Sequence, residues 1–163
     1  MAQMVSFDNG PIRVNARGEW LQGGEPLHPR VVELFSRHLV PSMDGRVFIQ
    51  LGFQRYELEI EDTAYFVTAM DIEKDGPRLT QVRLTVSDGR EELLRPDSLM
   101  QSAENVLYCR VLRRELGVAC RFSPSLYHTL ALEMDEDDAG FYLELNRVRH
   151  RVAVYDRTPL PMT

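Results

Sequence analysis

Four acidic residues lie close together in residues 54–62, and they are the densest group of side chains that could do chemistry. Glu57, Glu59 and Glu61 alternate with apolar residues, and Asp62 follows directly. Alternate residues of a strand share one face. Carboxylates placed in this way bind a cation through oxygen, act as a general acid or base, or form a solvated strand face. Since Glu61 and Asp62 are adjacent and point to opposite sides, at least one of them is a candidate for an internal hydrogen-bonded anchor.

Other charged groups have weaker patterns. Arg149 and Arg151 share a strand face, and they either hold an anionic group by forked hydrogen bonds or simply form a wet face. The acidic run 135–138 is similar to the start of a calcium loop, but Ala139 and Asn146 stand where oxygen ligands are required. We therefore interpret this run as a solvated connector. The four histidines show no metal-ligand spacing, so we expect no metal site, no cofactor and no catalytic residue.

Length and charge narrow the class of protein. The chain has 163 residues, is 44% hydrophobic and carries a formal net charge of −6. This length is typical of one globular domain with its own core, so we expect residues 1–163 to form a single domain. An acidic chain without a dense basic face is a poor candidate for nucleic-acid binding. It contains no apolar run of membrane-spanning length, so we expect no membrane contact.

The cysteine content and the first residues of the chain favour a reducing cellular compartment. Cys109 and Cys120 are the only cysteines, and the first residues show no export signal. We therefore expect a cytoplasmic protein in which both thiols are reduced, buried and small enough to pack in a core.

Two short helices and a series of strands must position these groups. The first predicted helix begins at Pro29, has apolar residues at helical spacing and ends before Pro41. The second is capped by Ser123, and its apolar stripe extends to Met134. Strands are expected at residues 12–15, 19–21, 46–51, 54–61, 65–73, 79–86, 90–94, 106–112, 141–145 and 148–155, and residues 115–120 fit either helix or strand. Because the strands are joined by short turns, neighbouring strands are antiparallel. The prediction is an α+β fold.

The two halves of the chain follow a common pattern. The unit is strand, turn, strand, loop, helix and hairpin, and it occurs at about residues 12–61 and again at about 106–155, with inserted strands at 65–94. This pattern predicts two tandem repeats, with antiparallel sheets each packed on a helix and one fused core. It also tips residues 115–120 toward a strand, and it places a cleft at the seam between the repeats.

Taken in order, several of these residues resemble an uncharacterised, mostly proteobacterial family classified only as a domain of unknown function. The family's G-x-W-x-x-x-G-x-P start is similar to Gly18-Glu19-Trp20 followed by Gly24 and Pro26. Its Leu-Phe-Ser helix corresponds to residues 34–36, and its V-E-D-A-P-F strand end corresponds to residues 60–65. The resemblance implies an α+β fold with a repeated motif and a ligand-binding module linked to signal transduction.

The same resemblance extends the set of candidate binding residues. A T-x-x-D turn of the family is similar to Thr85 and Asp88, and Trp20, Glu61 and Asp62 lie within the other motifs. We expect these five residues to lie near a cleft that takes a small polar ligand or a protein partner, without catalysis. One alternative is a metal-assisted hydrolase that uses Glu61 and Asp62. Another is a structural protein that forms homo-oligomers through an exposed edge strand such as residues 141–145.

Overall fold

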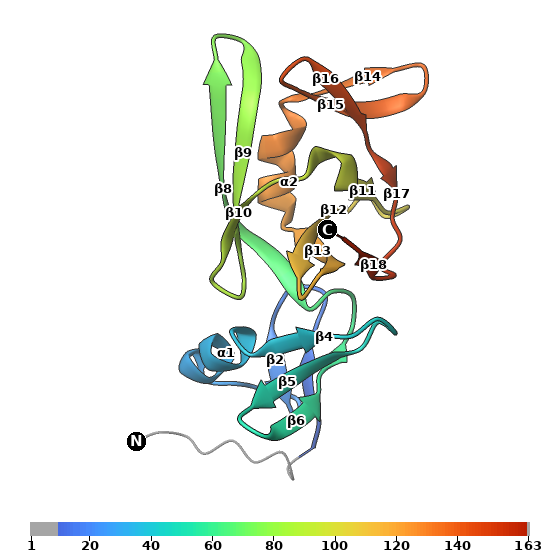
Figure 1. Ribbon diagram of the computed structural model, residues 1–163. Helices are drawn as coiled ribbons and strands as arrows, with labels where there is room; N and C mark the ends of the chain where they lie inside the picture. The colour runs from blue at the N-terminus through green and yellow to red at the C-terminus, as the bar shows by residue number, and fades with distance from the viewer. Residues whose placement is uncertain (1–9, 163) are drawn as a thin grey trace.

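The computed structural model describes residues 10–162, which form two lobes stacked one above the other (Figure 1). The lower lobe has a four-stranded sheet of order β3-β2-β1-β7, a helix α1 and a three-stranded sheet of order β4-β5-β6. Its elements are β1 (Ile12–Val14), β2 (Trp20–Gln22), β3 (Glu25–Pro26), α1 (Pro29–Ser36), β4 (Leu39–Pro41), β5 (Val47–Leu51), β6 (Gln54–Glu57) and β7 (Glu59–Ile60).

The upper lobe is built on a larger sheet, of order β10-β9-β8-β13-β12-β11-β17, with β18 paired to β13. Helix α2 and a three-stranded sheet of order β14-β15-β16 complete this lobe. Its elements are β8 (Tyr65–Asp75), β9 (Arg78–Val86), β10 (Glu91–Leu93), a short 3₁₀ helix (Pro96–Ser98), β11 (Met100–Gln101), β12 (Leu107–Arg113), β13 (Leu116–Phe122), α2 (Pro124–Ala131), β14 (Met134–Asp137), β15 (Gly140–Leu145), β16 (Val148–Arg151), β17 (Ala153–Val154) and β18 (Leu160–Pro161). The predicted α+β fold is confirmed.

The two lobes share part of their element order. A hairpin (β1–β2 or β12–β13) leads into an eight-residue helix and then a three-stranded antiparallel sheet. A short strand then returns and pairs in parallel, β7 with β1 and β17 with β11. The long hairpin β8–β9 and the strands β10, β11 and β18 have no counterpart in the lower lobe, and β3 has none in the upper lobe. Two points stay predictions: the two halves are copies of one unit, and the boundaries of these copies lie at about residues 61 and 106.

Both helices begin where the sequence places them, because side chains cap them. The Ser123 hydroxyl accepts the Leu126 amide at 3.2 Å, and the His28 ring accepts the Arg30 amide at 3.1 Å. The predicted end of α1 is wrong, however. The helix stops at Ser36, and Pro41 ends strand β4 instead. β4 is an edge strand, where a proline's missing N–H leaves no ladder bond unmade.

The acidic run predicted to be a connector is also a strand. Residues 134–137 form β14, an edge strand whose Asp137 accepts Arg151 at 2.6 and 2.8 Å. Charged side chains on an edge strand discourage pairing with another chain. Because β14 and β16 flank β15, residues 141–145 form a central strand, and the proposed edge for oligomerisation is not there.

Two segments predicted as single strands are each divided into two. Residues 54–61 become β6 and β7, and residues 148–155 become β16 and β17. In both cases the chain leaves one sheet and enters another. At the first break Leu58 is buried and donates its amide to Val47. The predicted alternation persists across this break, with exposed glutamates at 57, 59 and 61.

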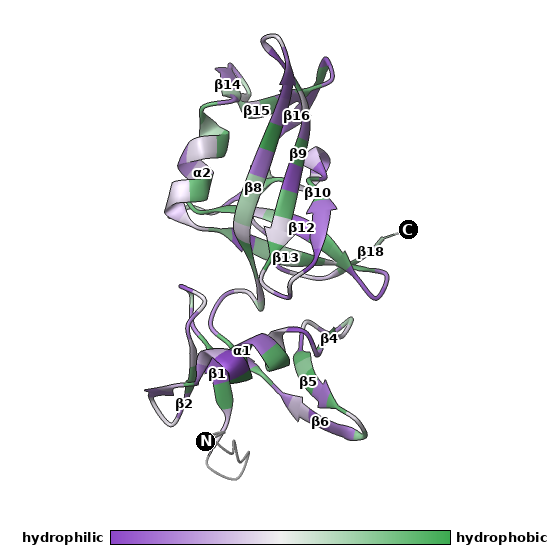
Figure 2. Cartoon of the chain, turned by 90° about the vertical axis from the view of Figure 1, so that its left-hand side faces the viewer, coloured by the Kyte–Doolittle hydropathy of each residue, from purple (hydrophilic) through white to green (hydrophobic). Residues whose placement is uncertain are grey.

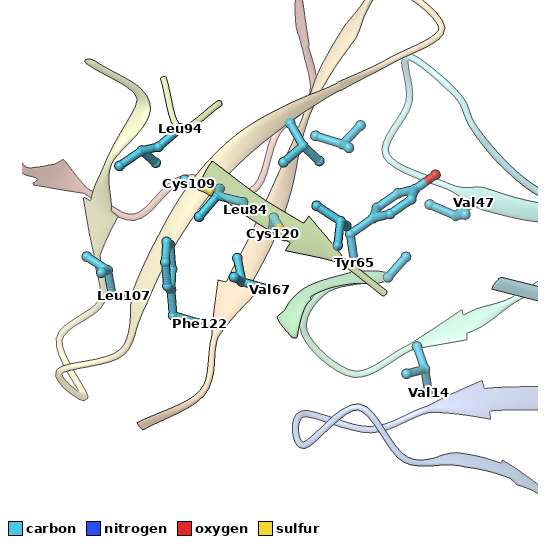
Figure 3. Close-up of a cluster of buried hydrophobic side chains, with 14 of the residues drawn as sticks. Val14, Val47, Tyr65, Val67, Leu84, Leu94, Leu107, Cys109, Cys120 and Phe122 are labelled. Atoms are coloured by element: carbon cyan, nitrogen blue, oxygen red, sulfur yellow. The ribbon is translucent and has the colours of Figure 1, made fainter. Parts of the chain in front are cut away.

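The core continues from one lobe to the other. Buried apolar side chains of the lower lobe, such as Val14 and Val47, belong to the same cluster as Val67, Leu84 and Phe122 of the upper lobe (Figure 3). Cys109 and Cys120 are paired across β12 and β13, and both are buried free thiols, as predicted. Along β8 and β9, apolar and polar residues alternate (Figure 2). Within residues 10–162, no helix combines the length and apolar character needed to cross a membrane.

Candidate functional site

A cavity of about 560 Å³ lies between the two lobes. The loop before β5 and the β6–β7 segment line it from below, the segment that joins the lobes lines it at the side, and β13 and the C-terminal segment line it from above. The lining residues are 41–47, 57–58, 60, 62–65, 118–119 and 157–159. Its volume falls within the range of sites for small molecules. Segments distant in the sequence therefore meet at the seam where a cleft was predicted.

Asp62 anchors the side of this cavity. Its Oδ2 atom accepts hydrogen bonds from the Tyr108 hydroxyl at 2.6 Å and from the Arg121 guanidinium at 2.7 Å, and its Oδ1 atom accepts the Tyr155 hydroxyl at 3.0 Å. The rings of Tyr108 and Tyr155 stack at 3.7 Å between centroids. Burial and the neighbouring carboxylate raise the pKa of both tyrosines. Of the pair Glu61 and Asp62, at least one of which is a candidate for an internal anchor, Asp62 makes the three hydrogen bonds at this cavity.

The C-terminal segment that covers the cavity is held by a buried arginine. Arg110 is 7% exposed and donates to the carbonyl oxygens of Asp156 and Thr158, both at 2.7 Å, and to that of Gly117 at 3.1 Å. Burial lowers the pKa of its guanidinium. With Tyr155 fixed by Asp62, these bonds position residues 157–159 over the cavity.

Tyr65 is the polar group at the cavity wall whose bonding is incomplete. Its side chain is 2% exposed, and its hydroxyl has no hydrogen-bond partner among residues 10–162. In Figure 3 the phenol points away from Val67 and Cys120, toward Val47 at the cavity lining. Burial, with the nearby Asp88, raises the pKa of this hydroxyl, so it is a neutral donor at neutral pH. A buried hydroxyl without a partner is costly.

The charges around the cavity are mostly balanced. Arg46 lies 2.8 Å from Asp44 and 3.6 Å from Glu57, while Asp62 is paired with Arg121. The bonds of Ser42 and Arg46 lower the pKa of Asp44 to about 2. Arg157 is exposed and forms no ion pair within the described part of the chain. Three arginines and three carboxylates therefore surround the cavity, and Arg157 is the arginine among them without a carboxylate partner in residues 10–162. The lining combines these groups and the neutral Tyr65 donor with apolar side chains.

The other predicted site residues lie elsewhere. Trp20 is buried against Phe35 in the lower lobe, with ring centroids 6.4 Å apart, so it packs the core. Glu61 accepts Arg13 at 3.2 Å and the amide of Ala16, which fixes the turn after β1. Thr85 is paired with Glu91 between β9 and β10, and its carbonyl accepts the Thr68 hydroxyl. None of these three predicted residues lines the cavity.

Asp88 lies at a different part of the seam. Its carboxylate accepts Arg113 at 2.6 and 3.1 Å, and Glu92 accepts the same guanidinium at 2.6 Å. Arg113 is 5% exposed and lies over the Tyr65 ring at 5.6 Å. The two carboxylates outweigh burial and raise the pKa of this arginine. Two of the five predicted residues thus lie at the seam between the lobes: Asp62 lines the first cavity and Asp88 lines a second one.

The carboxylates of the alternative metal site and the arginines of the basic hairpin are engaged in ion pairs with neighbouring side chains. Glu61 and Asp62 each hold an arginine, and among residues 10–162 no cluster of three or more His, Cys, Asp or Glu side chains is arranged to hold a metal ion. Arg149 and Arg151 lie over the Tyr142 ring and pair with Asp137. The hairpin is therefore a wet strand face that balances neighbouring acids.

Sequence reasoning missed Tyr65, Arg110, Tyr155 and Arg157. Tyr65 and Tyr155 look like ordinary strand residues, and Arg157 lies in a stretch without periodicity. The contact of Arg110 with Thr158 joins residues 48 apart. The one signal in the sequence is the position of Arg110 within the apolar run 107–112. A charged residue in a buried strand needs hydrogen-bond partners, so such a position indicates a structural contact.

Comparison with known proteins identifies the fold. The chain is similar to a crystal structure of a DUF1285 family protein from Silicibacter pomeroyi DSS-3, with a TM-score of 0.71 and 16% identity over 88% of this chain and 79% of the other. It is also similar to a DUF1285 family protein from Shewanella baltica OS155, with a TM-score of 0.60 and 16% identity over 76% of this chain and 92% of the other. No family model and no curated protein matches the sequence. The chain has the fold of an uncharacterised proteobacterial family.

Proposed function

We propose that this protein is a non-enzymatic binding module that takes a small organic acid into the cavity between its lobes. The observation that carries the proposal is the Tyr65 hydroxyl, which is buried at the wall of a ligand-sized cavity without a partner in residues 10–162. A ligand oxygen that displaces the atoms covering this hydroxyl would accept its hydrogen bond. The unpaired Arg157 favours an anionic group, and the apolar lining favours an apolar body.

Binding is favoured over catalysis by the state of the acidic residues. Both oxygens of Asp62 accept hydrogen bonds from neighbouring side chains, and Glu57 faces Arg46. A general base needs a lone pair within reach of the substrate. A module of this kind would report the presence of its ligand to another protein, which agrees with the signalling role that the sequence resemblance implies. Because the ligand contacts both lobes, its binding would stabilise their arrangement.

The experiment uses benzoate as the probe and measures its affinity by ligand-observed NMR. Tyr65→Phe removes the hydroxyl and keeps the ring, so we expect the affinity to fall about tenfold, the lower end of the value of one hydrogen bond to a charged acceptor. Removal of a buried unpaired hydroxyl should leave the free energy of unfolding unchanged or raise it. Arg157→Gln should also weaken binding.

Tyr142→Phe is the matched control. Tyr142 is also a buried tyrosine, but it lies in β15 of the upper lobe and does not line the cavity. This variant should bind benzoate as the wild type does. Equal affinities of the Tyr65→Phe variant and the wild type would remove the hydroxyl from the site, and equal losses in both tyrosine variants would show an effect on folding instead.

A further inference from the structure

A second, smaller cavity lies at another part of the seam. It measures about 280 Å³ and lies between the end of α1 with β4, the end of β5, the β9–β10 turn and the β12–β13 turn. Asp88 is the carboxylate among its lining residues, whereas four arginines line it: Arg37, Arg90, Arg113 and Arg114. A chain with a net charge of −6 therefore concentrates positive charge in one recess.

The arginines differ in how far they are neutralised. Arg113 is buried and fixed by Asp88 and Glu92. The guanidinium groups of Arg90 and Arg114 are exposed and form no ion pair within residues 10–162. They therefore remain available to an anion, beside a third guanidinium that the ion pairs hold in place.

Arg37 brings positive charge across the seam from the lower lobe. Its Nε atom lies 3.7 Å from the position that a Cβ atom on Gly89 would occupy, so this side chain reaches the β9–β10 turn. Arg37 also pairs with Glu33 at 2.8 Å, on the exposed side of α1. An anion held between Arg37 and Arg90 would thus contact both lobes.

The end of α1 does not cancel this charge. The last carbonyls of a helix carry partial negative charge. Here the His38 ring contacts the Leu34 carbonyl at 2.7 Å, the Arg37 amide donates to the Glu33 carbonyl, and the His38 amide donates to the Phe35 carbonyl. With these carbonyls satisfied, the guanidinium groups dominate the recess.

We propose that this second cavity binds a phosphate group. A phosphate dianion offers three strong acceptor oxygens, and arginine's planar fork matches phosphate geometry with paired hydrogen bonds. A carboxylate offers only two acceptor oxygens and would therefore leave more of the guanidinium donors without a partner. The volume admits phosphate and a few further atoms, which points to inorganic phosphate or a small phosphate monoester. This proposal is independent of the proposal that the first cavity binds an organic acid, because the two cavities share no lining residue.

The test is isothermal titration calorimetry with inorganic phosphate and with glycerol phosphate, at an ionic strength held constant with sodium chloride. We expect Arg90→Gln and Arg114→Gln each to weaken phosphate binding about tenfold, because each removes a charge-assisted hydrogen bond. Tighter binding of glycerol phosphate would assign a monoester as the ligand, and equal or weaker binding would assign free phosphate. Either result supports the phosphate site.

Arg83→Gln is the matched control, since Arg83 is an exposed arginine of β9 that lines neither cavity. It makes the same change in net charge, and it should leave the affinity within about twofold. Absence of phosphate binding by the wild type would overturn the proposal. Equal weakening in all three variants would also overturn it, because the effect would then come from net charge. Benzoate binding serves as an independent readout that these variants should leave unchanged.

Discussion

At the scale of single residues, Asp62 connects the segment between the lobes to β12, β13 and the C-terminal segment. Its partners Tyr108, Arg121 and Tyr155 lie 46, 59 and 93 residues further along the chain. The carboxylate and Arg121 are only 16% and 21% exposed in their side chains. Loss of one member of such a pair leaves the other charge partly desolvated, which is the larger part of the cost.

Asp62→Asn tests this anchor by removing the charge and keeping the shape. We expect the free energy of unfolding to fall by about 2 kcal/mol, because Arg121 and two hydroxyl donors lose a charged acceptor. Urea denaturation measures the change. Glu57→Gln is the control, since Glu57 also lines the cavity but is 51% exposed and lies 3.6 Å from Arg46. Its effect should stay below about 0.5 kcal/mol; similar losses in both variants would contradict the role of Asp62.

The tyrosines around the seam predict a loss of stability in alkali. Burial raises the pKa of Tyr65, Tyr108 and Tyr155 above the ordinary value of 10.0. Above pH 10 the unfolded chain releases these protons and the folded chain keeps them, so stability is complete below this pH and falls as the pH rises further. Ultraviolet titration of tyrosinate should show at least three of the six tyrosines, Tyr65, Tyr108 and Tyr155, ionising only with unfolding. Ionisation of all six near pH 10 in the folded protein would contradict the burial.

At the scale of elements, the C-terminal segment depends on Arg110. Arg110→Met keeps an unbranched apolar stem but removes three hydrogen bonds to carbonyl oxygens, two of them in residues 156–158. We expect amide hydrogen exchange at Leu160 and Met162 to become faster, because β18 loses the anchor that precedes it. Arg83→Met, an exposed position in β9, should leave these rates unchanged. Unchanged exchange in the Arg110 variant would show that β18 holds the segment alone.

Local patterns predicted most of the elements, and they failed where the partner of a segment is distant. Ser123 and Pro29 mark helix starts that depend on neighbouring residues. Leu34 is one of the apolar residues at helical spacing in α1, yet it is 47% exposed. The strands β4 and β14 exist because β5 and β15 pair with them, and no alternation in their own residues announces this. The adjacency of Glu61 and Asp62 is a local feature that marks the pair as candidates, whereas which of the two is the anchor and the unpaired hydroxyl of Tyr65 are properties of packing alone.

At the scale of the whole molecule, the continuous core predicts that the lobes unfold together. Trp20 is the only tryptophan, and it lies in the lower lobe. Far-ultraviolet circular dichroism reports on the strands and helices of both lobes, and the eight-stranded sheet lies in the upper lobe. Urea transitions followed by Trp20 fluorescence and by circular dichroism should therefore coincide. A Trp20 transition at distinctly lower urea would show that the lower lobe unfolds separately.

The central claim is that the cavity between the lobes receives a ligand, and chemical-shift mapping with benzoate tests it most directly. On titration of the isotope-labelled protein, the account predicts saturable shifts of the amides of Thr63, Ala119 and Thr158, from three separate segments that line the cavity. In the Tyr65→Phe variant the same amides should shift only at higher benzoate concentration. Shifts confined to residues around α2, or the absence of saturable shifts in the wild type, would contradict the claim.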